Sequence, residues 1–230
     1  MIDWNKQGHT YLKEKAIEKA AEAFNRAIED HPKDPIGYSN FGNLLLTIHE
    51  PARALAFFNK ALELQSDYAP ASYGLGNALY ELERYEEAIP CFQLAEQNGV
   101  TDDGDIHYML GMSYVNLSQL MMGLVHLQRA VELNEQDSEA RFQYALCLAK
   151  LGSLQLALQQ FDQVIEQQPE HADAHYNKGV ALASRGQTAE AIMAFQTAIK
   201  HQKDHVLAAN GLRALESAVE GNNEIKDEQL

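Results

Sequence analysis

Bulky and small apolar residues follow one another along the chain in an order that repeats every 34 residues. In most periods bulky side chains occupy repeat positions 4, 7, 11 and 24, and small ones occupy positions 8, 20 and 27. Small residues let two helices approach closely, while the bulky residues fill the space between them. Since short connections of about three or four residues require antiparallel neighbours, each period predicts a hairpin of two helices. The pattern predicts an all-α array of such hairpins.

Six periods follow one another in nearly unbroken register, over residues 1–34, 35–68, 69–103, 104–137, 138–171 and 172–205. One extra residue enters in the loop from Asn98 to Asp103. The first, second and sixth periods carry the pattern in Trp4, Gly8, Tyr11, Ala20, Phe24, Ala27, Pro32, Tyr38, Phe41, Gly42, Leu45, Ala54, Phe58, Ala61, His175, Gly179, Leu182, Ala191, Phe195 and Ala198. A fixed period of this length is the mark of a solenoid, in which each unit packs on its neighbours.

This order of residues resembles the tetratricopeptide-repeat (TPR) family over about residues 1–205. The resemblance implies a right-handed α-α superhelix of six hairpins, whose first helices line a concave groove. In that family repeat positions 2, 5, 6, 9, 12 and 13 point into the groove. The chain is similar in particular to short bacterial proteins made almost wholly of such repeats, the YrrB-like group, which implies an adaptor role in a cytosolic complex.

Breaks in the pattern predict where helices begin and end. Gly152 and Gly186 lie where the first helix of a hairpin must stop, and Pro51 suits the first turn of a second helix. After the sixth repeat, residues 206–219 predict a capping helix, since a solenoid needs a polar terminal unit. We therefore expect one solenoid over residues 1–219 and a polar tail over 220–230. No cap precedes the first repeat, so we expect Trp4 to be partly exposed.

The fourth repeat departs from its neighbours. It has Gly123 where the other five repeats have alanine, which costs a helix about 1 kcal/mol, and it carries Met121 and Met122 after the extra residue. We hypothesise that the junction of repeats three and four bends or opens more readily than the others. Ordinary drift in a tolerant repeat is the alternative.

Three kinds of residue recur at the expected inner positions. The first is aromatic, at position 5: Tyr73, Tyr108, Phe142 and Tyr176. These positions lie away from the hairpin core pattern, and a row of rings offers large contact area to a peptide at low entropic cost. Alternatively, each ring packs on the next repeat and stiffens the superhelix.

The second kind is asparagine, at Asn5, Asn40, Asn43, Asn77, Asn116, Asn177 and Asn210, with Met112 at another inner position. An amide offers a donor and an acceptor that match the backbone of an extended peptide. Hydrogen bonds between repeats are the alternative role. The third kind is acidic, at position 2: Asp105, Glu139 and Asp173. These carboxylates suit a lysine or arginine of a ligand, although acids are also favoured at a helix N-terminus by its dipole.

Charge and composition restrict the classes of partner that the protein could bind. Eighteen lysines and arginines against 33 acids give a net charge of −15, which argues against nucleic acid and against an anionic membrane. Cys91 and Cys147 lie in apolar helical runs without metal-like spacing, and are expected to be reduced. The N-terminus has no apolar core of a signal peptide, and no apolar run approaches about 18 residues. The cytoplasm is the expected location.

The sequence also argues against catalysis and cofactors. It has no phosphate loop, nucleophile elbow or HExxH motif. His171 and His175 have a spacing that suits a shared metal, but they flank a loop and have no evident third ligand. No metal or other cofactor is expected.

We therefore expect an interaction adaptor that binds an extended, basic or amphipathic segment of a partner protein in its groove. The candidate binding residues are Asn40, Asn43, Tyr73, Asn77, Asp105, Tyr108, Met112, Asn116, Glu139, Phe142, Asp173, Tyr176, Asn177 and Asn210. The alternative is a homo-oligomeric scaffold that associates through its ends or its convex face, with an apolar surface at Trp4.

Overall fold

The computed structural model of the protein describes residues 2–99 and 103–227. Within those ranges the regular structure is entirely α-helical, in agreement with the expected fold class. The helices are α1 Trp4–Lys13, α2 Ile17–Asp30, α3 Pro35–Thr47, α4 Pro51–Leu64, α5 Ala69–Glu81, α6 Tyr85–Gln97, α7 Gly104–Asn116, α8 Leu120–Leu133, α9 Ser138–Lys150, α10 Leu154–Gln167, α11 Ala172–Ser184, α12 Thr188–His201 and α13 Val206–Asp227.

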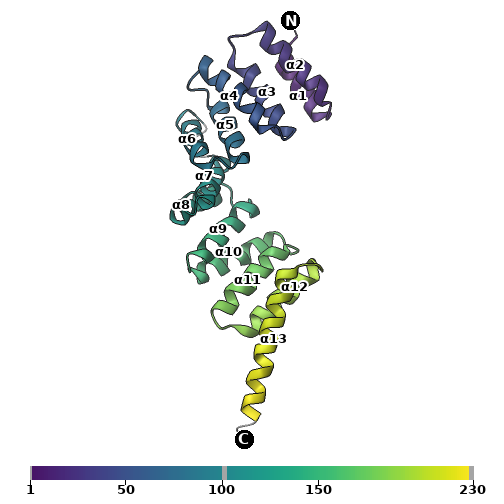
Figure 1. The fold of residues 1–230 in the computed structure, drawn as a ribbon, viewed down its shortest axis with the longest axis vertical. Helices are drawn as coiled ribbons and strands as arrows, with labels where there is room; N and C mark the ends of the chain where they lie inside the picture. The colour runs from purple at the N-terminus through teal and green to yellow at the C-terminus, as the bar shows by residue number, and fades with distance from the viewer. Residues whose placement is uncertain (1, 100–102, 228–230) are drawn as a thin grey trace. The chain divides into compact units, whose positions relative to one another are not determined.

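The chain forms two compact units, Met1–Gln119 and Leu120–Leu230. In the first unit α1 packs on α2, α3 on α4 and α5 on α6, and each pair contacts the next (Figure 1). In the second unit α9 packs on α10 and α11 on α12, and α13 packs on α12 (Figure 1). Short connections therefore place consecutive helices side by side in each unit, as the sequence predicts.

In four of the six hairpins the core is a phenylalanine ring at position 24 held against a glycine at position 8, whereas the fourth hairpin has Leu127 and the fifth has Ala145 at these positions. Phe24, Phe58 and Phe195 on the second helices are at most 3% exposed. A Cβ added to Gly8 would lie 2.3 Å from Cε1 of Phe24, and one added to Gly42 would lie 2.7 Å from Cε1 of Phe58. The ring thus occupies the space that any side chain at position 8 would need, so the two helices approach closely.

The same ring is covered from the other side by the next repeat. A Cβ added to Gly74, on α5, would lie 2.3 Å from Cε1 of Phe58, which belongs to α4. Gly211 on α13 has a similar relation to Phe195, at 2.9 Å from its Cζ atom. One aromatic side chain therefore joins the hairpin within itself and to its successor.

The first helices of all six hairpins end at repeat position 13, and two residues later, at position 15, the backbone has a positive φ. Gly152 and Gly186 have φ of +79° and +75°, which confirms that these glycines end helices α9 and α11. The other four repeats have Lys15, His49, Glu83 and Ser118 in the same conformation, with φ between 57° and 60°. Pro51 begins helix α4, as expected.

Repeat position 4 joins adjacent repeats by a polar bond. Tyr38 donates its hydroxyl to the carbonyl oxygen of Pro32 (3.2 Å), and Arg141 donates Nη2 to that of Glu135 (2.9 Å). His175 donates Nε2 to the carbonyl oxygen of Pro169 (2.9 Å). In each case the acceptor lies six residues earlier, in the turn that ends the preceding repeat. These bonds satisfy turn carbonyls that would otherwise need water.

Polar residues mark both ends of the array. Positions 3 and 10 are buried between neighbouring repeats, as at Ala71 and Ala78, but in the first repeat they are the exposed Asp3 and Thr10. On α13 the side that would face a further helix carries the exposed Arg213 and Glu216. Exposed polar groups at these positions disfavour the packing of a further repeat on them.

Helix α13 is longer than the sequence indicated. The expected capping helix covers residues 206–219, whereas α13 extends to Asp227 and so includes most of the segment expected as a polar tail. Once the first turns are fixed by packing, each further residue adds a backbone hydrogen bond at little cost. Residues 228–230 lie outside the described part of the chain.

The inserted loop also falls partly outside the description, since residues 100–102 are not among the described ones. The boundary between the two units lies after Gln119, inside the fourth repeat. The proposed hinge at the junction of repeats three and four remains a prediction.

Substitution Gly42→Ala is expected to lower the free energy of unfolding by about 1–3 kcal/mol, because the new methyl group overlaps the Phe58 ring. Alanine would otherwise stabilise a helix by about 1 kcal/mol relative to glycine. Urea denaturation measures the change. Phe58→Leu serves as the background control: adding Gly42→Ala to it should cost less, and an equal cost in both backgrounds would contradict the contact.

Glycine at the four strained position-15 sites is expected to raise stability. Replacing Lys15, His49, Glu83 and Ser118 together by glycine removes a left-handed conformation that costs up to about 1 kcal/mol per residue. The melting temperature measures the gain. Gln196→Gly, on an exposed site inside α12, is the matched control and should lower the melting temperature.

Candidate functional site

The first helices of the repeats follow one another directly within each unit. In the first unit α1 contacts α3, α3 contacts α5 and α5 contacts α7, while in the second α9 contacts α11 and α11 contacts α13. The inner positions expected from the sequence therefore succeed one another along each unit. The candidate binding residues lie on these helices.

Asparagine side chains link neighbouring first helices in the first unit. Asn40 donates Nδ2 to Oδ1 of Asn5 at 2.9 Å, which joins α3 to α1. Asn116 donates Nδ2 to the hydroxyl of Tyr80 at 3.1 Å, which joins α7 to α5. The inter-repeat role that the sequence left open is thus present. Each of these amides retains atoms that a ligand backbone can use.

The remaining asparagines have local surroundings. Oδ1 of Asn77 is buried without a hydrogen-bond partner among the described residues, and Asn177 donates Nδ2 to the carbonyl oxygen of Asp173 at 2.8 Å. Asn43 is exposed, and Asn210 accepts a hydrogen bond from Nη2 of Arg213 at 2.7 Å.

The position-5 rings contact the hairpin core, contrary to the expectation that they lie away from it. Tyr73 lies 5.8 Å from the ring of Phe92, and Phe142 lies 6.0 Å from that of Phe161. Tyr176 lies 5.8 Å from the ring of Phe195. Position 5 is one helical turn before position 8, so it shares the face that meets the core phenylalanine. That spacing could have revealed the contact from the sequence.

Because of these contacts, the rings differ in how much surface a ligand could reach. Phe142 is only 8% exposed, because the ring of His171 covers it at 4.7 Å. Tyr73, Tyr108 and Tyr176 are half-buried and retain some accessible surface. Burial raises the pKa of Tyr73, so its hydroxyl remains protonated at neutral pH.

The position-2 acids are exposed, at Asp105, Glu139 and Asp173. Glu139 accepts a hydrogen bond from Nε2 of Gln143 at 2.8 Å, and Oδ1 of Asp173 lies 3.2 Å from Nε2 of His205. All three belong to the first turn of their helices, so the favourable interaction with the helix dipole also applies. Beside them, Met112 is half-buried and Asn116 is exposed.

Histidine caps two helices, a role that the sequence reading missed. Nδ1 of His171 accepts from the backbone N–H of Ala174 at 3.2 Å, and Nδ1 of His205 accepts from that of Ala208 at 3.1 Å. Three other repeat boundaries have aspartate at the same position, at Asp34, Asp103 and Asp137, which was the available signal. Among the described residues, no group of three or more His, Cys, Asp or Glu side chains is arranged to hold a metal ion.

A hollow at the start of the array was also missed. It has a volume of about 650 Å³ and lies between the beginning of α1, the end of α2 and the beginning of α3. Its lining residues are Ile2, Asp3, Trp4, Asn5, Lys6, His9, Ala27, His31, Asp34 and Ile36. The signal in the sequence was the pair of isoleucines at exposed positions of the first two repeats.

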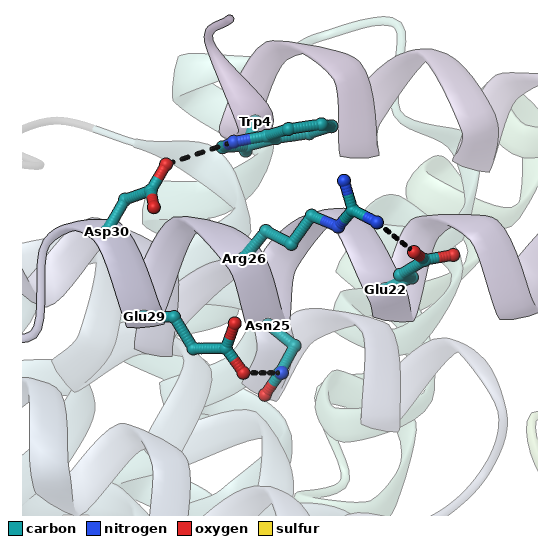
Figure 2. Close-up of polar contacts among 6 residues, drawn as sticks. All are labelled: Trp4, Glu22, Asn25, Arg26, Glu29 and Asp30. Carbon is teal, nitrogen blue, oxygen red and sulfur yellow. Dashed lines mark hydrogen bonds and ion pairs between the residues drawn. The ribbon is translucent and has the colours of Figure 1, made fainter.

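Trp4 forms a fixed wall of this hollow and is partly exposed, as expected. Its Nε1 donates to Oδ2 of Asp30 at 3.1 Å, and the guanidinium of Arg26 lies 4.8 Å from the ring centroid (Figure 2). Arg26 is held in turn by Glu22 at 2.6 Å (Figure 2). The indole is therefore held by a hydrogen bond and a cation–π contact.

None of the helices within the described residues is both long enough and apolar enough to cross a membrane.

Antiparallel helix pairs with a 34-residue period, a phenylalanine–glycine core and first helices that succeed one another define an α-helical repeat protein. Family models described as tetratricopeptide repeat match residues 39–102, 108–164 and 150–206, and a further one matches residues 4–29. The chain belongs to the tetratricopeptide-repeat family.

Solved structures agree with this assignment. YrrB, described as a TPR protein with an unusual peptide-binding site, is 49% identical, with a TM-score of 0.77 over 84% of this chain and 99% of that one. PilF of Pseudomonas aeruginosa is 19% identical, with a TM-score of 0.78 over 90% and 94% of the two chains. At that identity PilF supports the fold alone.

Curated relatives match over shorter stretches. The STIP1 homolog of Dictyostelium discoideum is 36% identical over 86 residues, which are 37% of this chain and 15% of the relative. The human tetratricopeptide repeat protein 21B is 28% identical over 134 residues, which are 55% of this chain and 10% of the relative. The chain spans only a small part of the length of these relatives.

The half-buried His175 of the sixth repeat is expected to make stability depend on pH. Burial lowers the pKa of His175, with the positive charge of nearby groups adding to the effect, so the folded state favours the neutral ring. Its stabilising contribution should be present above the unfolded value of about 6.5 and be lost as the pH falls through the lowered folded pKa.

Urea denaturation between pH 5 and 8 checks this, with about 6.5 as the reference point. The variant His175→Phe should lose less stability than the wild type as the pH falls. His31→Gln, at an exposed site, is the control. Equal pH dependence in the wild type and His175→Phe would contradict the assignment.

Proposed function

We propose that the protein is a non-catalytic adaptor that binds an extended, basic or amphipathic segment of a partner protein along the inner positions of its first helices. The observation that carries the proposal is the pairing of exposed carboxylates with partly accessible rings and amides in the second unit. Glu139 and Asp173 are exposed, and Tyr176 is half-buried beside Asn177. Carboxylates attract lysine or arginine, while rings and amides bind the rest of the segment.

The nearby cations in the second unit are already engaged. Lys178 pairs with Asp162 at 2.6 Å, and Arg213 bonds the Asn210 amide. A basic ligand would therefore meet carboxylates with little competition from side chains of the protein. The YrrB structure, with its peptide-binding site and 49% identity, supports a peptide as the ligand. We expect affinity of about micromolar, because ordering the segment consumes part of the contact energy.

A self-associating scaffold is the second candidate, and one observation favours it. Met121, Met122 and Val125 are exposed together on α8, at 64%, 48% and 62%. Exposed apolar groups of this kind occur at protein interfaces. Asp3 and Thr10 at one end and Arg213 and Glu216 at the other are polar and disfavour end-to-end stacking, whereas the exposed Ile2 at the first end favours it.

The cytoplasmic location is likewise a proposal. It fits the two cysteines, Cys91 and Cys147, which are both free thiols.

Removing the two acids is expected to weaken ligand binding. The double variant Glu139→Gln, Asp173→Asn should bind a lysine-rich extended peptide about 3–10-fold more weakly than the wild type, since each exposed ion pair contributes about 0.2–1 kcal/mol. Fluorescence anisotropy of a labelled peptide at low and high salt measures this, and the difference should shrink at high salt.

The matched control is Glu166→Gln, Glu170→Gln, which removes the same charge from exposed sites outside the inner positions. It should bind nearly as the wild type does. Equal losses in both double variants would show that only net charge matters and would contradict an inner-face site. Light scattering on the same samples should show monomers, and a concentration-dependent oligomer would favour the scaffold.

A further inference from the structure

We propose that the hollow at the start of the array receives one large apolar side chain of an extended, basic partner segment. The inference rests on the proposed adaptor function and adds a separate specificity site in the first unit. Three features of the hollow support it: the apolar side chains of its lining, an amide pair beside it and the carboxylates among its lining residues.

The walls of the hollow include apolar side chains that are exposed to solvent. Ile2 is 60% exposed and Ile36 is 41% exposed, and both line the hollow with Trp4 and Ala27. Covering exposed isoleucine with an apolar side chain is favourable by about 25 cal/mol per Å² of buried surface. The indole wall is held by Asp30 and Arg26, so it does not need to be ordered when a ligand enters (Figure 2).

The amide pair supplies contacts for a peptide backbone beside the hollow. Asn5 lines the hollow and its Oδ1 accepts from Asn40. In the part of the chain that the structure describes, no further side-chain hydrogen bond is found for Nδ2 of Asn5 or Oδ1 of Asn40. One donor and one acceptor therefore remain, which is the pair that a peptide unit requires.

The charge of the lining favours basic residues next to the apolar one. Asp3 and Asp34 line the hollow, and each accepts a backbone N–H at the start of its helix. Against these two carboxylates the lining has one ammonium, Lys6. The whole chain adds to this field with its net charge of −15.

Trp4 makes the test direct, because it is the only tryptophan of the chain and lies in the wall of the hollow. The probe is a short acetylated and amidated peptide of glycine and serine with a central Lys-Phe-Lys. Titration should give a saturable change in Trp4 emission. The same peptide with alanine in place of phenylalanine should bind at least about 10-fold more weakly. Replacing the lysines by glutamate should abolish the change.

Two isoleucines provide matched variants. Ile36→Glu, inside the hollow, should weaken binding of the Lys-Phe-Lys peptide at least 10-fold, while Ile48→Glu should not, since Ile48 is 38% exposed and does not line the hollow. Circular dichroism confirms that both variants fold. Equal binding by wild type and Ile36→Glu, or an equal loss with Ile48→Glu, overturns the proposal.

Calorimetry separates this proposal from the broader function. Suppose that the peptide binds without changing Trp4 emission, and that the variant Glu139→Gln, Asp173→Asn does not bind it. The proposal for the hollow is then wrong, while the adaptor function stands. If the peptide binds neither at the hollow nor at Glu139 and Asp173, both the hollow proposal and the adaptor function are wrong. If Ile36→Glu instead abolishes a concentration-dependent dimer seen by sedimentation, the occupant is a second copy of this chain and the proposal is wrong.

Discussion

In four of the six hairpins the contact between the phenylalanine at position 24 and the glycine at position 8 sets the distance between the two helices. Because the ring occupies the volume of a missing side chain, as Phe58 does against Gly42, the helices come together at a fixed separation. The same ring touches the next first helix at Gly74. Neighbouring hairpins within a unit are therefore positioned by one side chain that is almost completely buried.

Once the hairpins are in place, polar groups complete the joints between them. Position-4 side chains such as Tyr38 and His175 bond the turn carbonyls of the preceding repeat, and Asn40 bonds Asn5 between first helices. These bonds act at the surface of an apolar core, where an unsatisfied carbonyl or amide would be costly. Under the proposed function, structure and ligand recognition would share these residues, since an amide in a joint still presents atoms to a ligand.

The two units offer different chemistry at their inner positions. The second unit combines exposed Glu139 and Asp173 with Tyr176, which suits cationic side chains. The first unit begins with an apolar hollow whose indole wall is held by Asp30 and Arg26. An adaptor with both features would recognise a segment by charge and by one bulky residue, so each contributes selectivity that the other lacks.

The sequence by itself determined the helical repeat, because a 34-residue order of small and bulky residues admits few other packings, and it located Gly152, Gly186 and Pro51 correctly. Tertiary structure decided which inner residues are accessible. Phe142 is covered by His171, which lies 29 positions later, and the hollow gathers Ile2 and Ile36 from different repeats. A periodic pattern specifies which face a residue occupies, whereas exposure depends on neighbours brought close only by folding.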